Sequence, residues 1–136
     1  MSERTHGVFH DTGRARQLLL FDGLEYEGEV TPMDVDGLIE WHNEKRVLIE
    51  IKTKGTKVPY GQRKALERLV EDFGRIGKES VAIVAEHTVF DRKEDVIVAD
   101  CMVRELYHSR EHRWRPPKRL MTVKMLIDVF LGKSYC

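Results

Sequence analysis

Residues 31–52 read TPMDVDGLIEWHNEKRVLIEIK and decide the fold, because two alternating runs flank a short polar link. The runs span 34–41 and 46–53, and the link spans 42–45. This pattern predicts a β-hairpin. Successive side chains of a strand point to opposite faces. One face is therefore apolar and suited to burial, and it carries Val35, Ile39, Trp41, Val47, Ile49 and Ile51.

The opposite face of the hairpin gathers charge. Folding the strands about Asn43 sets Asp36 opposite Glu50, with Lys52 one pleat further along. Like charges in directly opposed positions destabilise a strand pair. A divalent cation between the carboxylates would relieve this, since Mg²⁺ binds carboxylate oxygens. A solvated face that binds no ion is the alternative interpretation.

These residues resemble the core motif of the PD-(D/E)XK nuclease superfamily, which includes restriction-endonuclease-like and Holliday-junction-resolvase-like proteins. In that family one strand carries an aspartate and its neighbour carries E-x-K, matched here by Asp36 and by Glu50-Ile51-Lys52. The chain has no literal Pro-Asp, so Asp34 and Asp36 are both open as the matching aspartate. The hairpin register favours Asp36, because a slip of one residue would move it to the other face.

The resemblance covers about residues 13–86. It implies an α/β fold with a restriction-endonuclease-like αβββαβ core, in which helices flank a central mixed sheet, and a C-terminal strand-loop-helix extension over about 87–136. The residues predict, in order, a helix at 13–21, an edge strand at 24–30, the hairpin, a helix from Pro59 to about Ile76, a buried strand at 80–86, a strand at 95–107, a loop at 110–119 and a helix at 123–131. The first helix after the hairpin should bury Leu66, Leu69, Val70, Phe73 and Ile76. Strand 80–86 follows a crossover helix, so it should lie parallel to a neighbour.

The resemblance also implies a Mg²⁺-dependent endonuclease acting on DNA, with Mn²⁺ able to substitute. It assigns the metal to Asp36, Glu50 and the main-chain carbonyl of Ile51. Lys52 would orient the attacking water or neutralise charge on the phosphate. Gln62 matches a glutamine found in several branches of the family and joins the catalytic set; an exposed helix-forming role is its plain alternative. Family members often carry one more acidic ligand near the first helix, for which Glu25, Glu27 and Glu29 are equal matches. A homodimer would present one site to each DNA strand.

Net charge neither marks nor excludes a nucleic-acid binder, because the 136 residues hold 23 basic and 23 acidic side chains. The basic residues are instead concentrated in 52–68 and 104–124. Phosphate contacts supply most of the affinity for nucleic acids. The expected DNA contacts are Arg14, Arg16, Lys54, Lys57, Arg63, Arg113, Arg115 and Lys118. Ordinary segregation of charge between solvated faces is the alternative.

Length and composition narrow the class further. The 136 residues are expected to form a single domain, 1–136. Two cysteines make neither a disulfide framework nor a CxxC metal site. No apolar run reaches the roughly 20 residues that span a membrane, and the polar N-terminus lacks a signal-peptide core. The sequence therefore predicts a cytoplasmic protein with no membrane partner. Two rival interpretations are an inactive nucleic-acid-binding or assembly module on the same fold and a purely structural α/β protein.

Overall fold

The structure, a computed structural model, describes residues 19–28, 30–91 and 93–133. The chain divides after Met33 into two compact units. In the first unit the described residues form neither helix nor strand. Tyr26 and Val30 exchange backbone hydrogen bonds of 2.7 and 2.8 Å across a tight turn.

The predicted edge strand at 24–30 is wrong for the described residues. All of them are exposed, so no apolar side chain is buried there to stabilise a strand. Of the predicted helix at 13–21, residues 13–18 lie outside the described part of the chain, and 19–21 are not helical.

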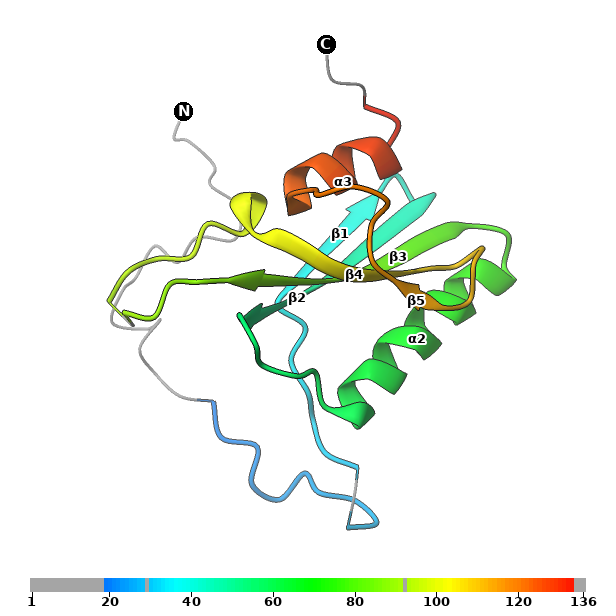
Figure 1. Cartoon of the computed structure of the whole chain (residues 1–136). Coiled ribbons are helices and arrows are strands. Elements are labelled where there is room, and N and C mark those ends of the chain that lie inside the picture. The colour runs from blue at the N-terminus through cyan, green and yellow to red at the C-terminus, as the bar shows by residue number, and fades with distance from the viewer. Residues whose placement is uncertain (1–18, 29, 92, 134–136) are drawn as a thin grey trace, which may run out of the picture. The chain divides into compact units, whose positions relative to one another are not determined.

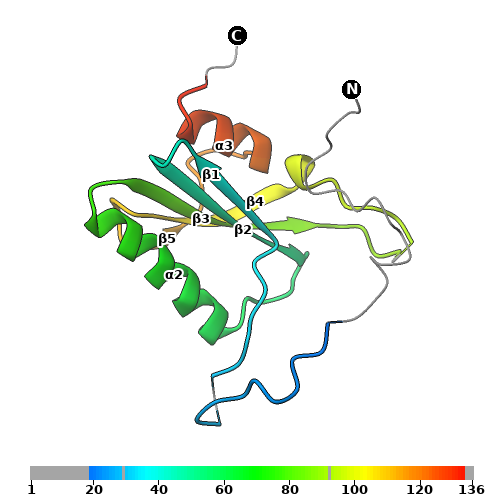
Figure 2. The same cartoon turned by 180° about the vertical axis from the view of Figure 1, so that it is seen from behind.

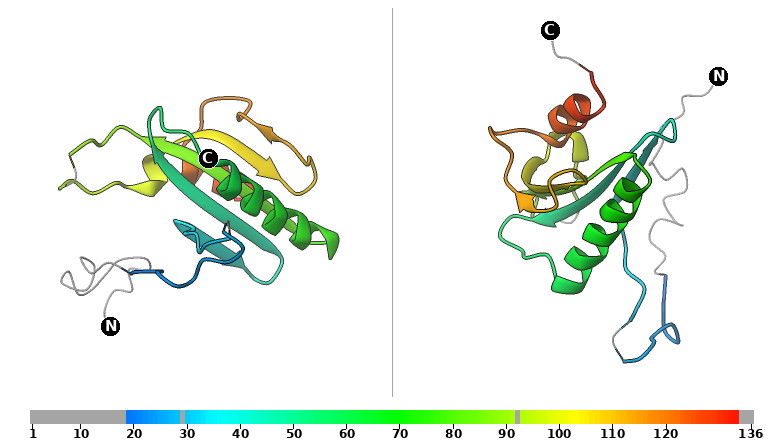
Figure 3. Two further views of the ribbon diagram at one scale, coloured as in Figure 1. Left: turned by 90° about the horizontal axis from the view of Figure 1, so that it is seen from below. Right: turned by 90° about the vertical axis from the view of Figure 1, so that its right-hand side faces the viewer.

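The second unit is built on a five-stranded sheet whose strands follow chain order from edge to edge. The strands are β1 (Gly37–Trp41), β2 (Lys45–Thr53), β3 (Glu79–His87), β4 (Met102–His108) and β5 (Trp114–Arg115). β2 and β3 are parallel, as predicted from the crossover, and the other neighbouring pairs are antiparallel. Helix α2 (Tyr60–Arg75) covers one face and α3 (Val123–Phe130) the other (Figures 1 and 2). The sheet separates the two helices in the right-hand view of Figure 3.

The general α/β class, with helices flanking a mixed sheet, is confirmed. The αβββαβ order is not. The elements of the described residues run ββαβ and then continue with β4, β5 and α3, without the first helix and strand of the predicted core. The C-terminal part is also more than an appendage, because β4 pairs directly with β3 and extends the same sheet.

The hairpin has the predicted register. Gly37 pairs with Ile49 and Ile39 with Val47, so the ladder is centred on Asn43. The turn is tight: Glu44 N–H donates to the Trp41 carbonyl at 2.8 Å. Asn43 adopts a φ of 58°, a left-handed conformation that asparagine tolerates better than most residues. β1 begins at Gly37 rather than at 34, which leaves Asp36 just before the strand.

Each face of the sheet has its own apolar cluster. Against α3 lie residues of β2, β3 and β4 such as Val47, Ile83 and Leu106, packed on Ile127. Against α2 lie Leu48, Leu66, Val70, Ala82 and Tyr107. The predicted strand 80–86 is accordingly buried on both faces from Ser80 to Ala85. Val35, predicted on the same face as Ile39 and Val47, packs instead on the α2-side cluster, because the chain leaves the strand geometry before Gly37.

Helix α2 begins after Pro59, whose fixed φ suits a helix start and whose missing N–H costs no hydrogen bond there. Leu66, Val70 and Phe73 form its buried stripe as predicted. Leu69 and Ile76 are instead 51% and 66% exposed. Leu69 lies one step round the helix from the stripe, and Ile76 lies beyond the last helical turn.

The predicted strand at 95–107 is half right. Residues 98–100 form a 3₁₀ turn, and β4 starts only at Met102. Within β4 the register shifts: Val84 pairs with Glu105, and Ala85 with Val103. Arg104 is therefore an extra, bulged residue.

The final helix matches its prediction, since the Thr122 hydroxyl caps α3 by accepting a hydrogen bond from Met125 N–H at 3.2 Å. No helix among the described residues has both the length and the apolar character needed to cross a membrane.

Candidate active site

Four predicted side chains converge on the α2 side of the sheet: Asp36, Glu50, Lys52 and Gln62. Asp36 precedes β1, Glu50 and Lys52 lie on β2, and Gln62 lies in the first turn of α2. One further step of the observed ladder sets Asp36 opposite Glu50, as the sequence predicted. The Oδ2 atom of Asp36 also accepts a hydrogen bond of 2.7 Å from the Ile51 N–H, which fixes the carboxylate against β2.

Glu50 is the buried acid of the group, with only 4% of its surface exposed. Its Oε2 atom lies 3.3 Å from the Lys52 ammonium. Its Oε1 atom is buried and has no hydrogen-bond partner in the described part of the chain. Burial and the neighbouring charge of Asp36 raise the pKa of the Glu50 carboxyl, while Lys52 and Gln62 act in the opposite direction. A positive ligand between the two carboxylates would counter both causes of the raised pKa.

Gln62 presents a second acceptor that lacks a donor. Its Nε2 atom donates to the main-chain carbonyl of Asp34 at 3.4 Å. Its Oε1 atom is buried and, like Glu50 Oε1, has no partner among the residues that the structure describes. Buried oxygens normally have a donor or an ordered water. Two such oxygens from different elements, next to an acidic pair, are the kind of site that a cation with bound water would satisfy.

The main chain of Ile51 supplies a third oxygen at the same place. The β1–β2 ladder ends at Gly37 and Ile49, so Ile51 lies beyond it. In an antiparallel ladder a residue directs its N–H and C=O to the same neighbouring strand. The Ile51 N–H bonds to Asp36, and its carbonyl therefore faces the same edge, where β1 has ended.

The oxygen atoms at this site suit a hard cation, although they come from two carboxylates and a main-chain carbonyl. No group of three or more His, Cys, Asp or Glu side chains suited to a metal occurs in residues 19–28, 30–91 and 93–133. The predicted site does not need one, because two carboxylates and a carbonyl leave room for the waters that Mg²⁺ retains.

Of the two candidate aspartates, Asp36 is the one whose carboxylate contacts β2. Asp34 contributes its main-chain oxygen to Gln62 instead. Glu25 and Glu27 are exposed residues of the first unit, and Glu29 lies outside the described residues.

The predicted DNA contacts fall into three groups. Arg14 and Arg16 lie outside the described residues. The exposed members are Lys54, Lys57, Arg113 and Lys118. Arg63 and Arg115 are already paired within the protein, with Glu105 and Glu111 respectively, so phosphate contact by these two competes with internal acids.

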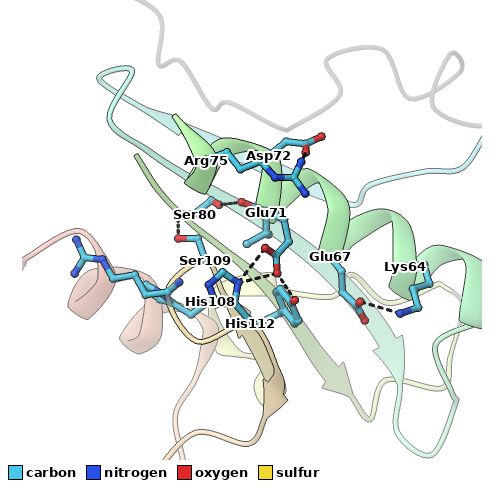
Figure 4. Close-up of polar contacts among 12 residues, drawn as sticks. Lys64, Glu67, Glu71, Asp72, Arg75, Ser80, His108, Ser109 and His112 are labelled. Atoms are coloured by element: carbon cyan, nitrogen blue, oxygen red, sulfur yellow. Dashed lines mark hydrogen bonds and ion pairs between the residues drawn. The ribbon is translucent and has the colours of Figure 1, made fainter. Parts of the chain in front are cut away.

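A second polar cluster, which the sequence did not predict, joins α2 to β4 and the turn that follows it. Glu71 accepts a hydrogen bond from the buried Tyr107 hydroxyl, and both its oxygens lie 2.9 Å from His112 Nδ1 (Figure 4). Next to it Trp114 is half-buried and donates from Nε1 to Glu67 at 2.7 Å. The available signal was the i, i+4 spacing of Glu67 and Glu71 on α2, because a pair of like charges at this spacing is unfavourable unless other groups neutralise it. Each of the two glutamates accepts a hydrogen bond from a side chain of β4, β5 or the turn between them, which indicates a role in stability.

Replacing Glu71 with leucine should lower the free energy of unfolding by about 1–3 kcal/mol, because the buried Tyr107 hydroxyl loses its acceptor. Hydrogen bonds from Tyr107 and His112 lower the pKa of Glu71, so its stabilisation is present above the ordinary value of 4.5 and is lost as the pH falls through the lowered pKa. Urea unfolding at pH 7 and pH 3.5 measures both effects, and the difference from the parent should shrink at the lower pH. Asp72→Leu, at an exposed position one residue along the same helix, is the control, with a change within about 0.5 kcal/mol.

Comparison with known proteins adds no identification: no family model, no curated protein and no solved structure matches this chain.

Proposed function

We propose that this protein is a metal-dependent endonuclease that hydrolyses phosphodiester bonds of DNA, with Asp36, Glu50, Lys52 and Gln62 as its active site. The observation that carries the proposal is the pair of buried oxygens, Glu50 Oε1 and Gln62 Oε1, which lack a donor among the described residues. They lie beside a second carboxylate and an ammonium, in the arrangement that resembles the PD-(D/E)XK motif.

Asp36, Glu50 and the Ile51 carbonyl would hold the cation. When bound, Mg²⁺ supplies Lewis-acid polarisation of a phosphoryl oxygen and a water of lowered pKa. Asp36 is preorganised for its part by the 2.7 Å hydrogen bond from Ile51 N–H. Gln62 would orient a water through its free Oε1 atom.

Lys52 would stabilise negative charge that develops on the phosphate. Its ammonium is held 3.3 Å from Glu50, and one-fifth of its side chain is exposed, so it is both anchored and accessible to a substrate. A fixed cation at such a position is worth more than one in bulk water, because it needs no reorganisation during the reaction. Lys54 and Lys57, which are exposed in the connection that follows β2, would contact flanking phosphates.

The test is cleavage of labelled duplex, flap and four-way-junction DNA with Mg²⁺, with Mn²⁺ and with chelator. The parent protein should cleave at least one substrate only when the metal is present. Asp36→Ala should lower the rate of cleavage about 100-fold or more. Losing a residue that only supports a metal ligand already costs up to about 100-fold, and Asp36 is itself a proposed ligand. Asp34→Ala is the matched control and should stay within about twofold of the parent, because Asp34 contributes only main-chain oxygen to the site.

Calorimetric titration with Mn²⁺ separates this function from an inactive DNA-binding module. An inactive module would bind DNA without metal and give no Mn²⁺ heat. Loss of cleavage in Asp34→Ala with full activity in Asp36→Ala would instead reverse the assignment of the two aspartates.

A further inference from the structure

The bulge in β4 points two consecutive side chains, Arg104 and Glu105, to the same face of the sheet. Val103 and Leu106 both belong to the cluster on the α3 side, although they are three residues apart. In a regular strand an odd separation would place them on opposite faces. The extra residue lets Arg104 and Glu105 both reach partners on the α2 side, which is the face that carries Glu50 and Lys52.

Arg104 uses its guanidinium as a two-pronged clamp. One nitrogen donates to the main-chain carbonyl of Thr56 at 2.7 Å, and another donates to Glu86 at 3.1 Å. Thr56 lies in the connection between β2 and α2, which leads from Lys52 to Gln62. The clamp therefore fixes that connection to β3. Glu105, the next residue, makes a second link from β4 to the start of α2, because it pairs with Arg63, the immediate neighbour of Gln62.

The start of α2 needs such an anchor. Its N-cap is Pro59, which offers no side-chain hydrogen bond, and its first turn contains no acidic residue. Gly55, earlier in the same connection between β2 and α2, has a φ of 88°, in the left-handed region that favours glycine. Helix starts without capping bonds are less stable than capped ones, so the contacts from β4 replace local stabilisation that the sequence of the connection lacks.

The same clamp also affects Lys52. Glu86 lies directly beside Lys52 on the neighbouring strand. Because Arg104 occupies Glu86, Lys52 is left to pair with Glu50 at 3.3 Å. Without Arg104, Glu86 would compete for the same ammonium.

We propose that Arg104 is a positioning residue of the active site: by joining Thr56 to Glu86 it holds Gln62 and Lys52 in place around Glu50. It touches neither metal nor substrate. This inference rests on the proposed function for its effect on cleavage, but its effect on Gln62 is measurable without any metal or DNA.

The experiment compares the parent with Arg104→Gln and Arg104→Lys in metal-free ¹⁵N NMR spectra, with the Gln62 side-chain amide signal identified by its loss in Gln62→Ala. Arg104→Gln should shift that signal toward free glutamine, together with the backbone amides of residues 54–63. Arg104→Lys keeps a cation for Glu86 but loses the planar fork, and it should give a smaller shift. Arg75→Gln is the control: it removes an exposed ion pair with Asp72 near the other end of α2 and should leave the Gln62 signal unmoved.

Cleavage supplies the second measurement. Arg104→Gln should lower kcat about 10–100-fold with little change in KM, which is the range typical of losing an outer residue that orients the groups of a metal site. Arg104→Lys should recover part of the rate.

An unmoved Gln62 signal in Arg104→Gln overturns the proposal, and so does a parental kcat in a variant whose Gln62 signal has moved. If Arg104→Gln does not give a folded spectrum, Arg104→Lys decides by the same criteria. A parent that cleaves nothing and binds no Mn²⁺ would refute the proposed function, while the Gln62 signal would still decide whether Arg104 positions this cluster.

Discussion

Replacing Glu50 with glutamine should lower the rate of DNA cleavage by about 100-fold or more while leaving the protein folded. Glu50 is the most buried member of the site, and its Oε1 atom has no donor within the described chain. Glutamine keeps the size of the side chain but removes the negative charge that a hard cation requires. Mn²⁺ binding, measured by calorimetry, should be lost together with cleavage.

The free energy of unfolding of Glu50→Gln without metal gives a second prediction. Burial and Asp36 raise the pKa of Glu50, so the charged form is disfavoured in the folded protein without metal. Neutral glutamine should therefore leave the free energy of unfolding at pH 7 equal to or above that of the parent. Adding Mn²⁺ should raise the melting temperature of the parent and not that of Glu50→Gln. Full nicking of DNA by Glu50→Gln in Mg²⁺ would refute the site.

Replacing Lys52 with alanine should separate catalysis from metal binding. We expect the single-turnover rate to fall about 10²–10³-fold, the usual cost of removing one preorganised charge from a site where negative charge develops. Lys52 donates to Glu50 and is not a ligand, so Mn²⁺ affinity should be retained or slightly increased when the competing ammonium is removed. Rapid-quench cleavage and calorimetry measure the two quantities.

Lys54 is the natural control for Lys52, because it lies two residues along the chain and is exposed. Lys54→Ala should weaken DNA binding and reduce its salt dependence by about one phosphate contact, with the rate at saturating DNA unchanged. A Lys52→Ala variant that loses Mn²⁺ binding as completely as Glu50→Gln would contradict a purely catalytic role for the lysine.

The hairpin and its charged face could be predicted from sequence because period-two alternation is a local signal. The ladder centred on Asn43 follows from where polar residues interrupt two apolar runs, and a shift of one residue would have buried charge. The same period-two alternation predicted that Asp36 lies opposite Glu50. Gln62 was reachable only through the family resemblance, since its i, i+3 neighbours on α2 look like those of any exposed helical residue.

Other features depend on tertiary contacts that no local pattern encodes. Segment 24–30 alternates as well as many strands do, but its apolar side chains Leu24, Tyr26 and Val30 are all exposed, so no burial stabilises a strand there. The bulge at Arg104 depends on how β4 pairs with β3. The alternation of residues 95–107 predicts one long strand, whereas β4 begins only at Met102. The sequence predicts phosphate contact for Arg63, since its partner Glu105 is 42 residues away and gives no local signal.

The position of β3 within the sheet has a consequence for how the chain matures. β3 is buried on both faces and pairs with β2 on one side and β4 on the other. A nascent chain that has reached only residue 87 would display an unpaired, strongly apolar strand edge, the type of surface that promotes association between chains. That edge is paired only after β4 has been synthesised, and β4 also carries Arg104. The contacts of Arg104 with Thr56 and Glu86 and the protection of the β3 edge would thus be acquired in the same late folding event.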